Sequence, residues 1–311
     1  MGMGFFVFEL MAMAERSYSR QGSGSIKDGI GMRKTVLVIA GVVFACFAMG
    51  MAEQTGWVNE TGAASLAIAR HSWDIGPEIS HIKYEEPGVM EQDGTMIGVG
   101  LSYTYHSGGA ESVFEGISEE RQSDGGEMFR GDIRFSSGQV DYDGALQDGT
   151  LIQEDNVDDN LFEIRGLMGV DSFGVSSLST LYIGLGYRYL NDDSSSDASG
   201  YERESNYLYM PVGVETSRAV DGGWVVGGTA EFDVFLWGHQ TSDLRKFGEG
   251  VIENDQHSGY GFRASLRFEK DDFVIEPFIR YWNIDESDVD HGWVEPANET
   301  TEYGVKFVWR F

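Results

Sequence analysis

The sequence predicts an all-β fold, a closed antiparallel up-and-down transmembrane β-barrel of about ten strands. Three observations support this prediction. Apolar and polar residues alternate with a period of two along many segments, charged residues keep to the polar face of those segments, and no heptad or long amphipathic helical pattern occurs. The chain has 311 residues, 42 glycines and only 5 prolines, so it is long enough and suitably composed for one closed barrel.

The strands are expected where this alternation is strongest. Ile97, Val99 and Leu101, for example, alternate with two glycines and a serine. In the first predicted strand the apolar phase slips between Ile79 and Ile82, which predicts a β-bulge there. The predicted strands are Ile75–Tyr84, Ile97–Tyr105, Phe129–Phe135, Phe162–Val170, Leu181–Tyr189, Leu208–Val214, Trp224–Leu236, Tyr260–Phe268, Phe273–Tyr281 and Tyr303–Phe311.

The position of the charges favours lipid around the apolar face. A charged side chain facing lipid at mid-membrane costs roughly 2–4 kcal/mol, and the apolar faces of these strands carry none. The alternative is a soluble barrel with an apolar interior and the charged row in water. On the transmembrane interpretation the polar face lines the lumen, and the predicted lumenal charge network consists of Arg130, Asp132, Arg134, Glu163, Arg165, Arg188, Glu231, Asp233, Arg263, Arg267, Glu276, Arg280, Lys306 and Arg310.

A barrel of about ten strands has room inside for side chains and some water, but not for a wide channel. Unpaired charges in such a narrow space would be unfavourable, so we expect the lumenal residues to form an interlocked ion-pair network. The sequence therefore predicts a structural plug, and a selective pore lined by arginines is the alternative.

The N-terminal segment predicts export. Arg33 and Lys34 are followed by an almost wholly apolar run and then by small residues, which is typical of a secretory signal peptide. The single cysteine, Cys46, lies inside this run and would be removed with it. The expected organisation is an upstream extension from a mis-assigned start over residues 1–31, a signal peptide over residues 32–52, an N-terminal lead-in over residues 53–72 and the barrel over residues 73–311.

The composition is strongly acidic, with 51 acidic and 22 basic residues and a net charge of −29. Such a charge argues against nucleic acid as a partner. The densest acidic stretches are Asn191–Asp193 and Asp285–Asp290, which could attract divalent cations through oxygen ligands or remain a solvated surface. Neither stretch has EF-hand spacing, and the scattered histidines make no metal-ligand pattern, so we expect no metal site and no cofactor.

The links between the predicted strands alternate in length, as a barrel in an outer membrane requires. One link breaks the alternation, because Ser107–Gly126 is long on the side where the other links are short. The short links are Asp171–Ser177, Ser217–Gly223 and Glu269–Asp272, and the long links are Asp141–Asn160, Asn191–Arg203, His239–Ser258 and Asp285–Thr300.

The last strand carries an aromatic or apolar residue at every second position up to the final residue. Together with the alternating strands and the unequal links, this tail resembles the outer-membrane β-barrel family of Gram-negative bacteria (porin-like, OmpA-like) over about residues 73–311. The resemblance implies location in the outer membrane, contact with its lipid and with lipopolysaccharide, including through divalent cations, and insertion by the barrel assembly machinery. The C-terminal assembly signal that it implies consists of Tyr303, Phe307, Trp309 and Phe311.

Two short acidic patterns resemble those of the omptin proteases, which are ten-stranded outer-membrane barrels. The patterns are Asp141-Tyr142-Asp143 and Asp255-Gln256-His257. The resemblance implies that His257, oriented by Asp255, activates a water opposite Asp141 and Asp143. Other catalytic motifs are absent from the sequence. We therefore expect a non-enzymatic surface barrel with a structural, adhesive or ligand-binding role, and the alternatives are a narrow porin-like channel and an omptin-like protease.

Overall fold

The computed structural model describes residues 66, 69–107, 125–145, 151–174, 176–195 and 200–311. The predicted upstream extension, the predicted signal peptide, most of the lead-in and most of the Ser107–Gly126 link lie outside these residues. Within them, no helix has both the length and the apolar character needed to cross a membrane. The strands are β1 (His71–Glu86), β2 (Met90–His106), β3 (Gly126–Ala145), β4 (Leu151–Phe173), β5 (Ser177–Asp193), β6 (Glu202–Val220), β7 (Trp224–Asp243), β8 (Val251–Gln256), β9 (Gly259–Lys270), β10 (Phe273–Ile284) and β11 (Asn298–Arg310).

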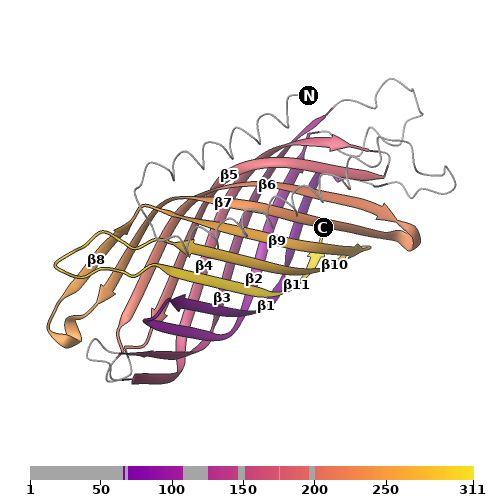
Figure 1. The fold of residues 1–311 in the computed structure, drawn as a ribbon. Helices are drawn as coiled ribbons and strands as arrows, with labels where there is room; N and C mark the ends of the chain where they lie inside the picture. The colour runs from indigo at the N-terminus through magenta and orange to yellow at the C-terminus, as the bar shows by residue number, and fades with distance from the viewer. Residues whose placement is uncertain (1–65, 67–68, 108–124, 146–150, 175, 196–199) are drawn as a thin grey trace, which may run out of the picture. The chain divides into compact units, whose positions relative to one another are not determined.

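The strands form one closed antiparallel barrel (Figure 1). Successive strands pair with one another from β1 to β7 and from β9 to β11, β7 pairs with both β8 and β9, and β1 pairs with β11. The sheet therefore closes on itself, and among the described strands only β8, which pairs with β7 alone, has a free edge. The short strand β8 continues the line of β9, because both pair with β7. Counting β8 and β9 as one position, the barrel has ten strands around its circumference. This confirms the predicted fold class and strand number.

The two ends of the barrel differ, and we name them for reference. The terminal end holds the start of β1 and the C-terminus, where the backbones of Trp73 and Phe311 exchange hydrogen bonds of 2.8 and 3.0 Å. Two tight connections, 221–223 and 271–272, also lie at this end. The distal end holds the connections after β5, β7 and β10.

Along each strand, buried side chains alternate with exposed ones, as expected for a closed sheet whose alternate side chains point into and away from the barrel. The exposed row is apolar over a band that runs from the terminal end to the middle of the strands. Aromatic residues mark both borders of this band. At its terminal border lie Trp73, Phe129, Trp224, Phe273, Trp309 and Phe311, and at its distal border lie Tyr187, Tyr189, Trp237, Tyr260, Tyr281 and Tyr303.

The predicted bulge in the first strand is wrong. β1 keeps one continuous register with β2 and with β11 through Ile79 and Ile82. The apolar phase slips because Ile82 points into the lumen, where it packs in a small apolar cluster with Met96 and Leu161. Register shifts occur instead between Val140 and Tyr142 in β3 and opposite Leu208 in β6.

Two of the four predicted long links, Asp141–Asn160 and His239–Ser258, are mostly strand rather than loop. β3 and β4 continue to Ala145 and from Leu151, and β8 occupies the middle of the predicted link between His239 and Ser258. The pairing continues because inward residues such as Val140 and Leu190 still alternate with polar outward ones. The strands thus extend well past the distal border of the apolar band. We call this part the distal extension.

Candidate functional site

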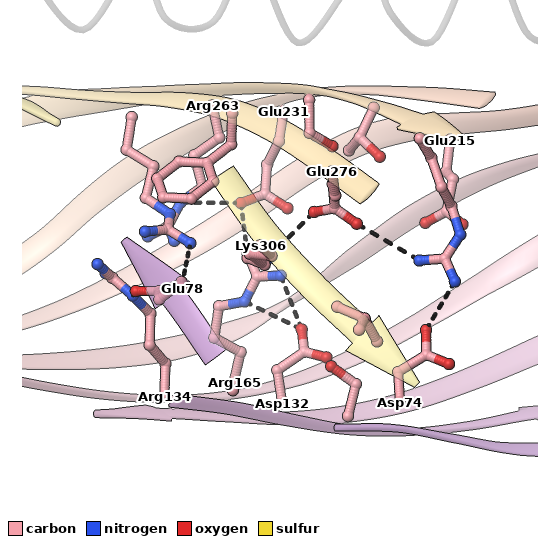
Figure 2. A pocket seen from close by; sticks show the side chains of 18 of the residues that line it. Asp74, Glu78, Asp132, Arg134, Arg165, Glu215, Glu231, Arg263, Glu276 and Lys306 are labelled. Carbon is pink, nitrogen blue, oxygen red and sulfur yellow. Dashed lines mark hydrogen bonds and ion pairs between the residues drawn. The ribbon is translucent and has the colours of Figure 1, made fainter. Parts of the chain in front are cut away.

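The lumen of the terminal half is filled with charged side chains (Figure 2). They surround a cavity of about 140 Å³, which has room for a few water molecules. Arg134 on β3 pairs with both Glu78 on β1 and Glu302 on β11. Arg280 on β10 approaches the same two carboxylates, at 3.4 Å from Glu78 and 3.2 Å from Glu302. Two arginines and two glutamates therefore tie the two sides of the barrel seam together.

A second group of ion pairs connects the strands β4, β7 and β9 on the other side of the lumen. Arg263 on β9 lies 2.5 Å from a carboxylate oxygen of Glu163, 2.7 Å from Asp233 and 3.2 Å from Glu231. Arg165 on β4 lies 2.6 Å from Glu231 across the lumen. These guanidinium groups each contact carboxylates from more than one strand, so the ion pairs cross the lumen rather than run along one wall.

A third group lies toward the terminal end. Arg310 and Arg267 flank Asp74 at 2.8 and 3.0 Å, and Lys306 lies 3.1 Å from Glu276. Arg267 also reaches Glu276 at 3.4 Å. Because each carboxylate here has at least one cation beside it, little unpaired charge is left in the terminal half.

The structure places every residue of the predicted lumenal charge network on the inward face: Arg130, Asp132, Arg134, Glu163, Arg165, Arg188, Glu231, Asp233, Arg263, Arg267, Glu276, Arg280, Lys306 and Arg310. It adds carboxylates that the sequence analysis left out, namely Asp74, Glu78, Glu215 and Glu269. Asp74 lies just before the predicted first strand, which begins at Ile75. The even-numbered positions of β1 form one inward row, and both Asp74 and Glu78 belong to that row.

An aromatic layer lies directly on the ionic network toward the distal end. The Tyr209 hydroxyl donates to Glu163 at 2.7 Å, and its ring meets the Trp282 ring edge-on at 5.0 Å between centroids. Tyr207 stacks against Trp282 at 6.5 Å and packs against Phe235 at 5.6 Å. All four aromatic side chains are buried. Together with the apolar cluster around Ile82 on the opposite wall, this layer lines that level of the lumen mostly with uncharged side chains.

Arg188 differs from the other lumenal arginines. Its guanidinium carbon lies 5.9 and 5.7 Å from the ring centroids of Tyr207 and Trp282. None of the ion pairs among the described residues involves Arg188. Its described contacts are the cation–π contacts with these two rings, at the level of the aromatic layer.

The distal half of the lumen contains more acids than bases. Arg203 lies 2.6 Å from Glu86, 3.1 Å from Asp192 and 3.6 Å from Glu295, and its guanidinium carbon lies 4.8 Å from the ring centroid of Tyr84. One cation thus faces three buried carboxyl groups. The sequence analysis assigned these residues to loops, although Arg203 continues the inward row of β6.

The four predicted protease residues do not form one site. Asp141 and Asp143 project outward from β3, and Asp255 projects outward from β8 on the opposite wall in the strand order. Since all three point away from the lumen, they cannot converge on a shared water molecule. His257 pairs with Asp288 at 3.0 Å rather than with Asp255.

The carboxylates of Asp255, Asp141 and Asp143 each bind a neighbouring residue instead of facing one another. Asp255 pairs instead with His239 at 3.0 Å. Asp141 accepts a hydrogen bond from the backbone of Asn156 at 3.1 Å, and Asp143 accepts one from the Gln153 amide at 2.5 Å. Each candidate is therefore part of a local contact between adjacent segments. The inward positions beside them belong to Tyr142 and Gln256.

The outward face of the distal extension is polar and mostly acidic. Between β5 and β6, the Tyr189 hydroxyl donates to Glu204 at 2.7 Å and the Asn191 amide donates to Glu202 at 3.0 Å. Across the described part of the chain, no group of three or more acidic, histidine or cysteine side chains is arranged to hold a metal ion. The extension is thus an acidic surface without a preformed metal centre.

The residues of the predicted C-terminal signal lie on the outward, apolar face of β11. Tyr303, Trp309 and Phe311 are 53%, 48% and 74% exposed. Trp309 meets the ring of Phe273 at 5.5 Å between centroids. These exposed aromatic residues belong to the apolar band and its borders.

Solved structures with a similar fold are outer-membrane β-barrels. The outer membrane protease OmpT from Escherichia coli aligns at 9% identity and TM-score 0.45, over 80% of this chain and 100% of that protein. The translocator domain of the autotransporter NalP from Neisseria meningitidis aligns at 10% identity and TM-score 0.39, over 89% and 98%. The attachment invasion locus protein Ail of Yersinia pestis aligns at 13% identity and TM-score 0.30, over 78% and 100%.

No protein-family model and no curated protein matches the sequence. At these identities and TM-scores, the structural neighbours share a β-barrel architecture with this chain. The activities of these neighbours are not assigned to this chain.

Proposed function

We propose that the chain is an outer-membrane β-barrel of a Gram-negative bacterium, with a sealed lumen and a binding surface on its distal extension. The apolar outward band supports the membrane placement, because exposed side chains such as Ile97 and Met168, at 65% and 57%, would be unfavourable in water. Aromatic borders on both sides of the band match the interfacial girdles of membrane barrels. The closed sheet leaves no unpaired edge in lipid.

The observation that carries the sealing proposal is the succession of two filled layers in the lumen. Charged side chains cross the terminal half, and rings and aliphatic side chains fill the next level. An ion would have to separate ion pairs such as that between Arg263 and Glu163 and then pass the buried ring of Trp282. Both steps are unfavourable, so a plugged barrel fits the geometry better than a narrow channel.

With the lumen closed, the surface available for a partner is the distal extension. In this placement the terminal end faces the periplasm and the distal end faces the cell exterior. Outward carboxylates such as Glu204 and Asp255 would repel phosphate groups and attract cations. We therefore propose structural, adhesive or ligand-binding roles in which divalent cations bridge this surface to lipopolysaccharide or another anionic partner, with insertion by the barrel assembly machinery.

Conductance in planar lipid bilayers tests the sealing proposal. The purified wild-type barrel should give no single-channel steps. A matched variant with both Tyr209→Gly and Trp282→Gly, refolded in the same way, should leak, because it removes the aromatic layer. Stable wild-type channels of uniform conductance would contradict the proposal.

Labelling of intact cells tests the placement. A cysteine at Val289, which is 69% exposed on the connection after β10, should react with a membrane-impermeant maleimide. A cysteine at Asp271, in the tight connection between β9 and β10, should react only after the outer membrane is permeabilised. The opposite pattern would reverse the orientation, and recovery of folded protein without detergent would remove the membrane placement.

A further inference from the structure

The connection between β10 and β11, residues 285–297, folds back against the barrel wall. We call it the distal loop. Its Asp288 backbone amide donates to the Asp255 carbonyl at 2.9 Å, and the Asn254 side chain donates to the Asp288 carbonyl at 2.9 Å. Within the loop, the Ser287 amide donates to the Glu295 carbonyl at 3.0 Å. These contacts fix the position from which the Glu295 side chain leaves the loop.

The Glu295 side chain enters the distal half of the lumen. The residue is only 6% exposed, and its carboxyl oxygen Oε1 lies 3.2 Å from the Tyr84 hydroxyl. The same hydroxyl lies 3.0 Å from Glu86 Oε1. Glu295 is the loop residue that is inserted beside Arg203, at 3.6 Å. Glu295 thus joins the loop to the lumen, in addition to the hydrogen bonds that the inward side chains of Asn254 and Gln256 donate to loop carbonyls.

The hydroxyl of Tyr84 has a single hydrogen, so it can donate to one of these two carboxyl oxygens but not to both. Both contacts are fully satisfied when one of the two acids keeps its proton and donates it to the phenol oxygen. Of the two acids, Glu86 is the closer partner of the Arg203 guanidinium, at 2.6 Å, whereas Glu295 lies 3.6 Å away. The shared proton therefore belongs to Glu295.

We propose that Glu295 docks in the lumen as a neutral carboxylic acid, and that the distal loop is released when this acid ionises. The loop would then respond to pH at the distal mouth of the barrel. The proposal does not depend on the sealing of the lumen, and it depends on the proposed placement only for the side of the membrane that it concerns.

The surroundings of Glu295 favour the neutral form. The groups that face it are Tyr84 and Glu86 on β1, Asp192 on β5, Tyr201 before β6, Arg203 and Tyr207 on β6, and Gln240 on β7. Arg203 is the only cation among them, and Glu86 and Asp192 already contact it. Burial raises the pKa of Glu295 to about 7; the charge of Arg203 opposes this rise, and the charge of Glu86 adds to it.

The sign of the effect follows from this raised pKa. A free loop would release the proton near the ordinary pKa of 4.5, whereas the docked loop keeps it until about 7. Docking is therefore strongest below about pH 4.5, weakens as the pH rises from there to about 7, and changes little above that. Each unit by which the pKa is raised corresponds to about a tenfold weaker docking equilibrium at high pH.

Hydrogen–deuterium exchange of the refolded barrel tests the proposal. Protection factors, which correct for the intrinsic pH dependence of exchange, should fall about tenfold or more in residues 285–297 between pH 5 and pH 8. The protection factor of the connection 221–223, at the terminal end, should stay in a constant ratio to that of the most protected strands between pH 5 and pH 8. An unchanged protection factor for the loop would overturn the proposal.

Two variants separate Glu295 from the other acids. Glu295→Gln keeps the shape of the side chain and cannot ionise, so the loop should stay protected at pH 8. Glu286→Gln alters an exposed acid in the same loop and should keep the wild-type pH dependence. If Glu295→Gln retained the wild-type pH dependence, another group would control the loop. A wild-type barrel that conducts would reject the sealed lumen and leave this result intact.

Discussion

The two halves of the lumen handle buried charge in different ways. In the terminal half, carboxylates such as Glu78 contact arginines from two strands. In the distal half, Arg203 alone faces Glu86, Asp192 and Glu295. The terminal half can balance its charge with its own side chains, whereas the distal half needs protons or external cations to do so. The first arrangement suits a permanent plug, and the second suits a region that responds to its surroundings.

The largest expected effect comes from breaking the balanced half. Arg134→Ala would leave Glu78 and Glu302 with one arginine between them and should lower the free energy of unfolding by roughly 3–5 kcal/mol. Urea unfolding in lipid vesicles, followed by tryptophan fluorescence, measures this loss. Arg245→Ala removes an exposed arginine that pairs with Asp243 and should leave the unfolding curve unchanged. Equal effects of the two substitutions would contradict the comparison.

A charge on the lipid-facing side should have the next largest effect. Ile133 lies on the outward face of β3 within the apolar band, so Ile133→Arg should lower the free energy of unfolding in vesicles by roughly 2–4 kcal/mol. Asp141→Arg, on the same face but in the distal extension, should change it little. If both variants unfolded as the wild type does, the apolar band would not contact lipid.

Arg188→Met should change the free energy of unfolding much less than Arg134→Ala. Arg188 is buried against Tyr207 and Trp282 and pairs with no carboxylate of the described residues, so its loss leaves none of those acids unpaired. We expect stability within about 1 kcal/mol of the wild type, or slightly above it, in the same urea assay. A loss as large as that of Arg134→Ala would mean that the aromatic layer depends on this charge.

Phe311→Ala should have the smallest effect on stability, because the side chain is 74% exposed. Refolding in vesicles should be nearly unchanged. The amount of folded protein in outer-membrane fractions of cells should fall, because the assembly machinery would read this terminal aromatic residue. Normal cellular levels together with normal stability would remove Phe311 from the predicted assembly signal.

The apolar band and the terminal half of the lumen could be predicted from the sequence because lipid and water impose opposite requirements on alternate residues. Arg134 and Arg263 sit between apolar neighbours in sequence, so their inward orientation follows from the period of two. Their partners could not be predicted, because the pairs of Arg134 with Glu302 and of Arg263 with Glu163 join strands far apart in the chain.

The distal half was misjudged for a physical reason. Beyond the lipid band the outward row becomes polar, and the strands then look like acidic loops. Only the inward-facing residues show that the strand pairing continues; in β6 these are Tyr207, Ser205 and Arg203. The predicted protease site failed for the same reason, since the alternation that places Tyr142 inside also places Asp141 and Asp143 outside.

Infrared difference spectroscopy of the carboxylic acid carbonyl band tests the contrast between the two halves most directly. In a barrel refolded in vesicles at pH 6, replacing Glu295 with Gln should remove a protonated-acid band. The matched Glu78→Gln variant should remove none, because Glu78 lies ionised between Arg134 and Arg280. Loss of the acid band in Glu78→Gln, or no loss in Glu295→Gln, would contradict this account.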